Sequence, residues 1–177
     1  SLDFLLAYGP PAIKVPSACL TDTVLLEAIR RSGVPAILSV GMSTLDQIHR
    51  AVGALGPDRL ILLWCRSAYP CSPEALNLRA IHTMMERFPG RPIGYSGHET
   101  GLWTSLCAAV LGAAMIERHF TLDRAASGTD HAASLEPKGL ARLVQAIRRW
   151  EEARGTGELD GPIPAELPVL AKLRKFT

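Results

Sequence analysis

The sequence lacks several features that would place it outside the ordinary globular proteins. None of its apolar runs approaches the roughly 20 residues that a membrane-spanning helix needs. Its four cysteines have no CxxC spacing, and no secretory signal precedes them. Because three of them lie in or beside apolar runs, we expect buried free thiols. A net charge of +2 is too small to argue for nucleic acid or a membrane surface. We therefore expect a soluble, cytoplasmic protein that binds neither.

The sequence does contain a regular alternation of short apolar segments and amphipathic helices. Five apolar segments are predicted as strands: 12–15, 36–40, 60–64, 93–95 and 114–117. Each precedes a segment with helical spacing of its apolar residues: 22–32, 44–55, 74–87, 100–111 and 137–154. The end of another helix is predicted over 1–8. Because strands that alternate with helices form a parallel sheet covered by helices, the predicted fold class is α/β.

Two architectures are compatible with this alternation, a doubly wound sheet and a (β/α)8 barrel. No glycine-rich dinucleotide fingerprint follows the first strand, which disfavours the doubly wound sheet. Five strands cannot close an eight-stranded barrel, so the barrel interpretation requires further strands. From these patterns alone, both architectures stay open.

Polar side chains follow the predicted strands at the point where each strand ends. In both architectures the carboxyl ends of the strands meet at one edge of the sheet, where ligands bind. We therefore expect these side chains to lie near one another. They are Lys14, Ser17, Ser39, Ser67, Tyr69, Ser96, His98, Glu117 and His119.

The lysine and the serines of this set suggest an anion site, although each has an ordinary alternative. Lys14 lies within a strand, so it either faces a polar cavity and binds an anion, or reaches solvent from an edge strand. Ser17, Ser39 and Ser96 can donate hydrogen bonds to a phosphate near helix amino ends, or simply cap those helices. Only the repetition over several loops favours the anion site.

The histidines suggest a metal site. A single histidine at a strand end is more often just hydrogen-bonded, but His98 and His119 together can ligate a divalent ion. Glu117 lies two residues before His119, so both should point to the same face of the strand. Glu117 can hold a substrate hydroxyl or a metal-bound water, or pair with Arg118 or another basic neighbour. Asp130 lies in a loop where it is equally a turn former.

Six motifs, taken in order, give the sequence a specific resemblance. They are Lys14-Val15-Pro16-Ser17, Ser39-Val40-Gly41-Met42, Ser67-Ala68-Tyr69-Pro70, Gly94-Tyr95-Ser96-Gly97-His98-Glu99-Thr100-Gly101, Glu117-Arg118-His119-Phe120-Thr121-Leu122-Asp123 and Asp130-His131-Ala132-Ala133-Ser134-Leu135-Glu136-Pro137. Together they resemble the N-acetylneuraminate (sialic acid) synthase family, including its 9-phosphate and spore-coat-polysaccharide relatives. The resemblance extends from Ser1 to about Arg154.

This resemblance implies a fold, a reaction and a set of roles. The fold is the C-terminal five-strand part, strands four to eight, of a TIM (β/α)8 barrel. The reaction condenses phosphoenolpyruvate with N-acetylmannosamine, its 6-phosphate or a related N-acetylated amino sugar. The metal ligands are implied to be His98 and His119, for Mn²⁺ or Mg²⁺. The implied substrate-binding residues are Lys14, Ser17, Ser39, Ser67 and Ser96, and those that hold the acceptor are Tyr69, Glu117 and Asp130.

The sequence also departs from the family pattern. Barrel strands one to three, with an acid/base glutamate and a further lysine, have no counterpart here. Residues 1–154 are therefore expected to be a partial barrel, and 155–177 a linker toward an absent C-terminal antifreeze-like domain. Arg66 replaces the usual threonine, where it either crowds the site or adds an anion contact. The chain alone is expected to be inactive or severely impaired, and to form a homodimer or be complemented by the missing barrel half.

Two other functions fit these residues. One is a non-catalytic half-barrel that binds a phosphorylated ligand or a partner. The other is a different metal-dependent aldol-type barrel enzyme with other substrates. An assay of phosphate release from phosphoenolpyruvate separates the first alternative from the synthase, and a screen of acceptor sugars separates the second.

Overall fold

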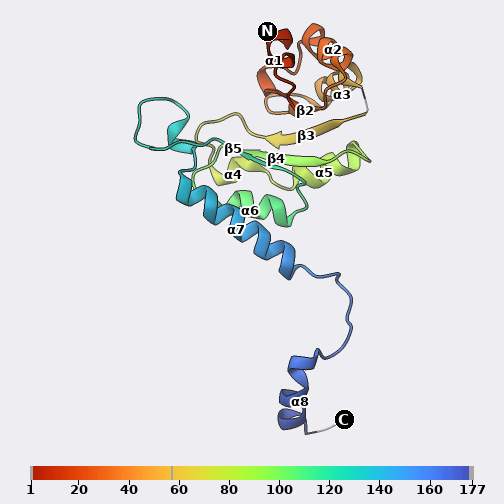
Figure 1. The fold of residues 1–177 in the computed structure, drawn as a ribbon, viewed down its shortest axis with the longest axis vertical. Helices are drawn as coiled ribbons and strands as arrows, with labels where there is room; N and C mark the ends of the chain where they lie inside the picture. Colours follow the sequence, from red (N-terminus) through yellow and green to blue (C-terminus); the bar gives the residue numbers. More distant parts are fainter. Residues whose placement is uncertain (1, 57, 176–177) are drawn as a thin grey trace.

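The computed structural model describes residues 2–56 and 58–175, which form one parallel sheet with helices against it (Figure 1). The sheet has five strands in the order β1-β2-β3-β4-β5, all parallel. They are β1 (Ile13–Val15), β2 (Ala36–Ser39), β3 (Leu60–Cys65), β4 (Ile93–Gly97) and β5 (Ile116–Arg118). All five predicted strands are confirmed.

The strand order distinguishes between the two architectures that the sequence allowed. A doubly wound sheet reverses its order at a switch point, whereas here each strand pairs with the next one along the chain. The sheet also curls, because Lys14 on β1 reaches Glu117 on β5 at 3.5 Å between Nζ and Oε2. Four strand spacings would separate these residues by roughly 19 Å in a flat sheet, at about 4.8 Å each. The chain is therefore a five-strand part of a (β/α) barrel.

Eight α-helices are described; those that lie between strands in the chain connect them, and all but α8 pack beside the sheet. They are α1 (Leu2–Leu6), α2 (Thr23–Ser32), α3 (Leu45–Leu55), α4 (Pro73–Leu76), α5 (Ala80–Arg87), α6 (Trp103–Val110), α7 (Pro137–Ala153) and α8 (Leu167–Leu173). Asp22 caps α2 by accepting a hydrogen bond from the Leu25 amide at 3.0 Å. Thr44 and Gln47 form a reciprocal capping box at α3.

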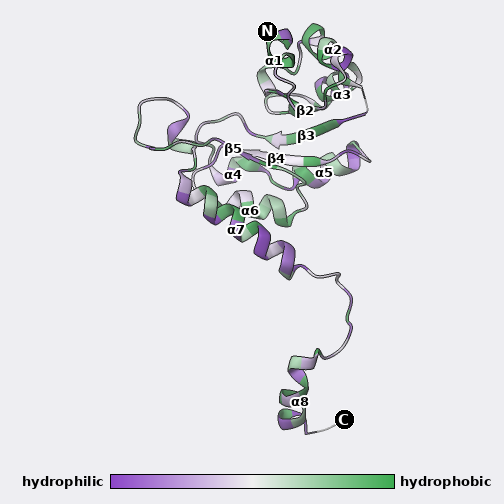
Figure 2. Cartoon of the chain, in the orientation of Figure 1, coloured by the Kyte–Doolittle hydropathy of each residue, from purple (hydrophilic) through white to green (hydrophobic). Residues whose placement is uncertain are grey.

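The register of the strands determines which side chains face inward. Val15, Leu38 and Leu62 are paired neighbours in the sheet, and all three are buried in the core shared with the helices. Side chains of the alternate positions point to the opposite, inner face of the curled sheet. Figure 2 shows β3 and β4 changing from hydrophobic to paler colours toward their carboxyl ends. The carboxyl ends of the strands are therefore where the sheet becomes polar.

Three features differ from the sequence prediction. The helix predicted over 74–87 is divided into α4 and α5, because Asn77 adopts the left-handed conformation with φ 47° and ends α4. The segment from 155 was expected to be irregular, but it contains α8, which lies apart from the sheet (Figure 1). Cys107 is exposed, although Cys65 and Cys71 are buried as predicted, and all four thiols are free.

Candidate active site at the carboxyl ends of the strands

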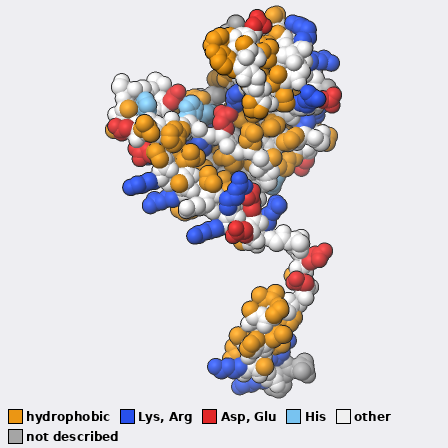
Figure 3. Space-filling view, in the orientation of Figure 1, with side chains coloured by type: hydrophobic (Ala, Val, Ile, Leu, Met, Phe, Trp, Pro, Cys, Tyr) orange, Lys and Arg blue, Asp and Glu red, His pale blue; other side chains and the backbone are white. Residues whose placement is uncertain are grey.

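A cavity of about 370 Å³ lies at the carboxyl ends of the strands. Nine of the ten predicted site residues line it, and only Asp130 does not. The nine are Lys14, Ser17, Ser39, Ser67, Tyr69, Ser96, His98, Glu117 and His119. The remaining lining residues are Pro16, Ala18, Met42 and Cys65. In Figure 3, histidine and acidic side chains lie near one another beside the projecting loop at one side of the molecule.

Strand geometry explains why these residues meet. Cys65, Ser96 and Glu117 are direct register partners on β3, β4 and β5, so their side chains share the inner face. His119 follows Glu117 by two positions and also lines the cavity, which confirms that both point the same way. Residues more than 20 positions apart in the chain are thus delivered to one place by parallel strands alone.

Glu117 is held by contacts from two strands. Its Oε2 lies 3.5 Å from Lys14 Nζ, and its Oε1 accepts a hydrogen bond from Ser96 Oγ at 3.2 Å. Both side chains of the Lys14–Glu117 pair are about one-third exposed, at 34% and 36%, so they lie at a solvent-accessible surface of the cavity. Lys14 therefore faces the cavity, and Glu117 pairs with this lysine and not with the adjacent Arg118.

Three side chains that line the cavity, Ser17, Cys65 and Ser67, lie against Gly41, and we call this part of the cavity wall its floor. The Gly41 amide donates to Ser17 Oγ at 2.9 Å, and Ser17 Oγ lies 3.3 Å from Cys65 Sγ. Ser39 is 3% exposed, and its hydroxyl has no hydrogen-bond partner among the described residues. Because a buried hydroxyl without a partner is unfavourable, Ser39 fits a position where a bound anion accepts a hydrogen bond from its hydroxyl.

The two histidines lie side by side with Tyr69. The ring centroids of His98 and His119 are 5.4 Å apart, and the Tyr69 ring is 4.2 Å from His98 and 5.6 Å from His119. His98 Nδ1 lies 2.6 Å from the carbonyl oxygen of Arg66, which requires a proton on Nδ1. The lone pair of His98 is therefore on Nε2, the nitrogen that a metal would bind.

Burial shapes the protonation of these groups. It lowers the pKa of His98, and the neighbouring charge of His119 lowers it further, while the bond to Arg66 opposes the shift. Burial raises the pKa of Tyr69, followed by the charges of Cys65, Asp130 and Glu117. His98 is therefore neutral at neutral pH, as a metal ligand must be, and the Tyr69 hydroxyl keeps its proton as a donor.

The side chains at this site fit a metal site that leaves positions for water or substrate better than one in which protein ligands enclose the ion. Within residues 2–56 and 58–175, no three or more His, Cys, Asp and Glu side chains converge tightly enough to enclose a metal ion. Two imidazoles beside the Glu117 carboxylate suit a divalent ion that also keeps water or substrate ligands. The residues present are thus compatible with the expected ion, with His98 and His119 as its ligands.

The loop after β5 lies at the rim of the cavity. Asp130 Oδ2 is 3.9 Å from His119 Nδ1, and the Asp130 side chain is half exposed. His131 does not join the site, because its Nδ1 lies 2.8 Å from Thr121 Oγ1 within the same loop. Asp130 therefore borders the site next to one imidazole without lining its interior.

Arg66 is turned away from the cavity. Its guanidinium carbon lies 5.0 Å from the centre of the Trp64 ring, and its Nε donates to the carbonyl of Ala75 at 3.1 Å. It does not line the cavity. Neither consequence expected from the sequence, crowding of the site or an added anion contact, is seen in its position.

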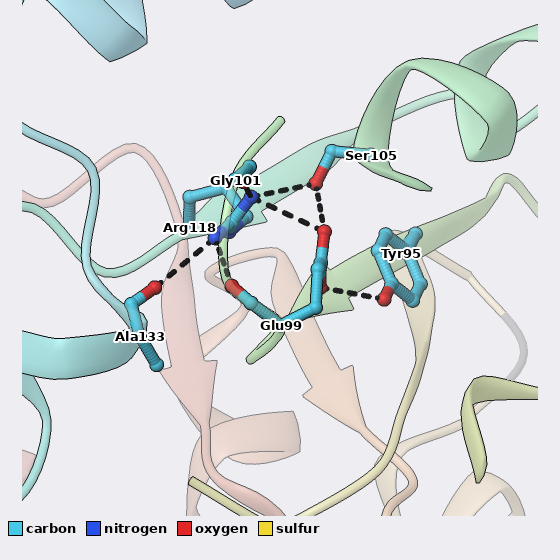
Figure 4. A network of polar contacts seen from close by, with 6 residues as sticks. All are labelled: Tyr95, Glu99, Gly101, Ser105, Arg118 and Ala133. Carbon is cyan, nitrogen blue, oxygen red and sulfur yellow. Dashed lines mark hydrogen bonds and ion pairs between the residues drawn. The ribbon is translucent and has the colours of Figure 1, made fainter. Parts of the chain in front are cut away.

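Sequence reasoning missed a buried polar network directly behind the cavity wall (Figure 4). Glu99 and Arg118 are its centre, with side chains only 1% and 2% exposed, and they form an ion pair at 3.2 Å. Burial raises the pKa of Glu99, but hydrogen bonds from Ser105 and the charge of Arg118 outweigh it, so the pKa lies below its usual value. The available signal was a charged residue directly beside each histidine, at positions whose side chains point away from the cavity.

Comparison with known proteins gives one consistent family. A family model described as the NeuB family matches residues 1–159. The human N-acetylneuraminate-9-phosphate synthase is 42% identical over 180 residues, which covers 99% of this chain and 49% of the relative. The N,N'-diacetyllegionaminic acid synthase of Legionella pneumophila is 37% identical, covering 99% and 51%. This chain spans about half the length of the curated relatives that it matches.

A solved structure agrees with these relatives. The N-acetylneuraminic acid (sialic acid) synthetase of Leptospira borgpetersenii serovar Hardjo-bovis, crystallised with citrate, superposes with a TM-score of 0.85 at 36% identity. The match covers 99% of this chain and 62% of that one. No helix in the described part of the chain has both the length and the apolar character to span a membrane.

Proposed function

This chain belongs to the NeuB family, and from that premise we propose that its cavity condenses phosphoenolpyruvate with an N-acetylated amino sugar. The observation that carries the proposal is the convergence of nine predicted residues from all five strand ends on one cavity. A pocket with one lysine, several hydroxyls and two imidazoles can hold an anion and a carbonyl compound side by side.

We assign phosphoenolpyruvate to the side of the cavity formed by Lys14 and the serines. Lys14 supplies the positive charge, and Ser17, Ser39 and Ser96 supply hydroxyl donors from the ends of β2 and β4 and the turn after β1. Ser39 supports this assignment most directly, because its buried hydroxyl has no partner among the described residues. Ser67 lies next to Gly41 at the floor, where it would contact either substrate.

We assign the acceptor sugar to the side that holds Tyr69, Glu117 and Asp130. A carboxylate can accept a hydrogen bond from a sugar hydroxyl, and Tyr69 keeps its proton as a donor. Mn²⁺ or Mg²⁺ bound at His98 and His119 would act as a Lewis acid toward the acceptor carbonyl. The hydrogen bond between His98 Nδ1 and the Arg66 carbonyl fixes which ring nitrogen faces the site.

In the proposed reaction, C3 of phosphoenolpyruvate forms a bond with the aldehyde carbon of the sugar. Water adds at C2, and the bond between C2 and the phosphate oxygen breaks. The products are a nonulosonic acid and inorganic phosphate. Lys14 remains close to the negative charge throughout, which stabilises the departing phosphate.

The organisation around this site is also part of the proposal. Residues 1–154 would be the partial barrel, and residues 155–177 a linker. The open edges of the sheet at β1 and β5 would pair with another copy or with a complementary barrel half, because unpaired strand edges invite such pairing. Mass measurement in solution, with and without the complementary half, tests this organisation.

The function is tested by measuring phosphate release from phosphoenolpyruvate and N-acetylmannosamine with Mn²⁺, and phosphoenolpyruvate binding by calorimetry. We expect His119→Ala to abolish turnover, while His49→Ala, an exposed histidine of α3, serves as the matched control. Binding without turnover, even when the complementary barrel half is added, is the result expected of a non-catalytic half-barrel. Efficient turnover of a non-acetylated aldose would favour another aldol-type enzyme. Neither binding nor turnover, even with the complementary half added, would refute the proposal.

A further inference from the structure

The buried network around Glu99 and Arg118 contains more hydrogen bonds than a single ion pair requires. Alternation along β5 sends Glu117 into the cavity and Arg118 to the opposite side, where Arg118 is enclosed between β5 and the start of α6. Glu99 follows His98 directly, just as Arg118 precedes His119. Each partner of the ion pair is therefore covalently adjacent to one imidazole of the proposed site.

The guanidinium of Arg118 bonds chiefly to backbone carbonyls (Figure 4). Nη2 donates to the carbonyl of Glu99 at 2.6 Å and to that of Ala133 at 3.0 Å. Nη1 donates to the carbonyl of Gly101 at 2.7 Å and to Ser105 Oγ at 3.0 Å. One side chain thus connects the segment that follows His98, the strand that directly precedes His119, and the loop that carries Asp130.

Glu99 neutralises this buried cation and is itself fully engaged. Tyr95 Oη donates to its Oε2 at 2.8 Å, and Ser105 Oγ donates to its Oε1 at 2.7 Å. A methyl group on Gly97 would lie 2.6 Å from Glu99 Oε2 and 2.9 Å from Arg118 Cδ, so the pair is tightly packed against β4. Both charges are therefore fixed in position.

Stability alone does not account for this arrangement. Buried ion pairs can often be replaced by apolar residues of similar size without loss of stability, since desolvation offsets their attraction. Apolar residues, however, cannot bond three carbonyls that lie in two separate segments, 99–101 and the loop of Ala133. Two terminal nitrogens of a planar guanidinium do so with a defined geometry.

We propose that Arg118, with Glu99 as its counter-ion, is a positioning residue that fixes His98, His119 and Asp130 relative to one another. The proposal rests on the assignment of His98 and His119 to the proposed site. Through the Glu99 and Gly101 carbonyls, Arg118 sets the path of the chain that follows His98. Through the Ala133 carbonyl it holds the rim loop so that Asp130 stays 3.9 Å from His119.

The test compares Arg118→Lys with Tyr95→Phe in the full chain. Lysine keeps the charge but has a single nitrogen, which cannot bond both the carbonyls of Glu99 and Gly101 and the carbonyl of Ala133. Tyr95→Phe removes one bond to Glu99 and leaves every carbonyl bond of Arg118 intact. The readouts are the imidazole ¹H–¹⁵N signals without metal, the contacts between the Tyr69 and His98 rings, and the apparent Mn²⁺ affinity. Core methyl signals of Leu38 and Leu62 report on the fold.

We expect Arg118→Lys to shift both imidazole signals and to weaken the Tyr69–His98 contact, with core methyl signals unchanged. Mn²⁺ affinity should fall about 10- to 100-fold, as for other residues that orient metal ligands. Tyr95→Phe should leave the imidazole signals and the affinity close to wild type. If Arg118→Lys does not fold, Glu99→Gln, which removes the counter-ion of Arg118 while keeping a side chain of similar size, should still shift the two imidazole signals together.

Opposite results would overturn the proposal. If a folded Arg118→Lys protein keeps wild-type imidazole signals and ring contacts, Arg118 is only structural. The same conclusion follows if Glu99→Gln lowers thermal stability without moving those signals. If the wild type binds no Mn²⁺ while Arg118→Lys still shifts the imidazoles, the metal assignment fails and the positioning role stands.

Discussion

Gly41→Ala provides the sharpest prediction about the cavity floor. The φ angle of Gly41 is not in the left-handed region, so alanine can adopt its backbone conformation without strain. Its new methyl group would nevertheless lie 2.5 Å from Ser67 Oγ, 2.8 Å from Cys65 Sγ and 2.9 Å from Ser17 Oγ. These contacts are shorter than van der Waals distances, so the three side chains must move.

The expected losses of stability and of phosphoenolpyruvate affinity in Gly41→Ala follow from this overcrowding. Inserting a methyl group into a tightly packed site typically costs about 1–3 kcal/mol. In a chain of this length each kcal/mol lowers Tm by about 2–4 °C. Displacing Ser17 also breaks its 2.9 Å bond to the Gly41 amide. We therefore expect phosphoenolpyruvate binding to weaken at least about tenfold, which is roughly 1.4 kcal/mol.

Gly53→Ala is the matched control for the same chemical change. Gly53 lies within α3, and a methyl group there would meet no atom within 4 Å. Alanine in a helix interior should stabilise the protein by about 0.5–1 kcal/mol relative to glycine. Thermal unfolding and calorimetric titration of both variants give the comparison. If Gly41→Ala raises Tm as Gly53→Ala does and binds phosphoenolpyruvate like the wild type, the described floor of the cavity is wrong.

Three further predictions concern single side chains. Ser39→Ala removes a buried hydroxyl that has no partner among the described residues, so it should stabilise the free protein by about 1 kcal/mol. It should also weaken phosphoenolpyruvate binding, and unchanged affinity in a titration would contradict the role given to Ser39. The folded-state pKa of His98 lies below its ordinary value of about 6.5, so protonation favours the unfolded state. The stability that neutral His98 provides is present above the ordinary pKa of about 6.5 and is lost as pH falls through the folded-state pKa. Urea unfolding should therefore give a lower free energy of unfolding at pH 5.5 than at pH 7.5, and His98→Asn should reduce that difference. In the native protein a thiol reagent should modify Cys107 quickly and the buried Cys65 and Cys71 slowly, and equal rates would contradict their different exposure.

Much of the fold was predictable from local patterns. Apolar runs of three to five residues, alternating with helical spacing, identify all five strands and most of the helices, because burial imposes these periods on the sequence. The parallel arrangement follows from the alternation itself. The break at Asn77 was not predicted, since a non-glycine residue with positive φ leaves no periodic signal.

The candidate site was predictable to a similar degree. Polar residues at strand ends must converge in a parallel sheet, and the spacing of Glu117 and His119 places both on one face. The orientation of Arg66 was not predictable, because stacking on Trp64 competes with every other direction that this long side chain can take.

The sequence by itself determined the order of the elements, the parallel sheet and the residues that gather at its carboxyl edge, because these depend on spacing along the chain. Tertiary structure alone decided which partners those residues have. The curl of the sheet brings Lys14 from β1 to Glu117 on β5, and the packing of residues 99–101 and of the loop of Ala133 around one guanidinium creates the network at Arg118. Such contacts join positions far apart in the chain, so no local pattern records them.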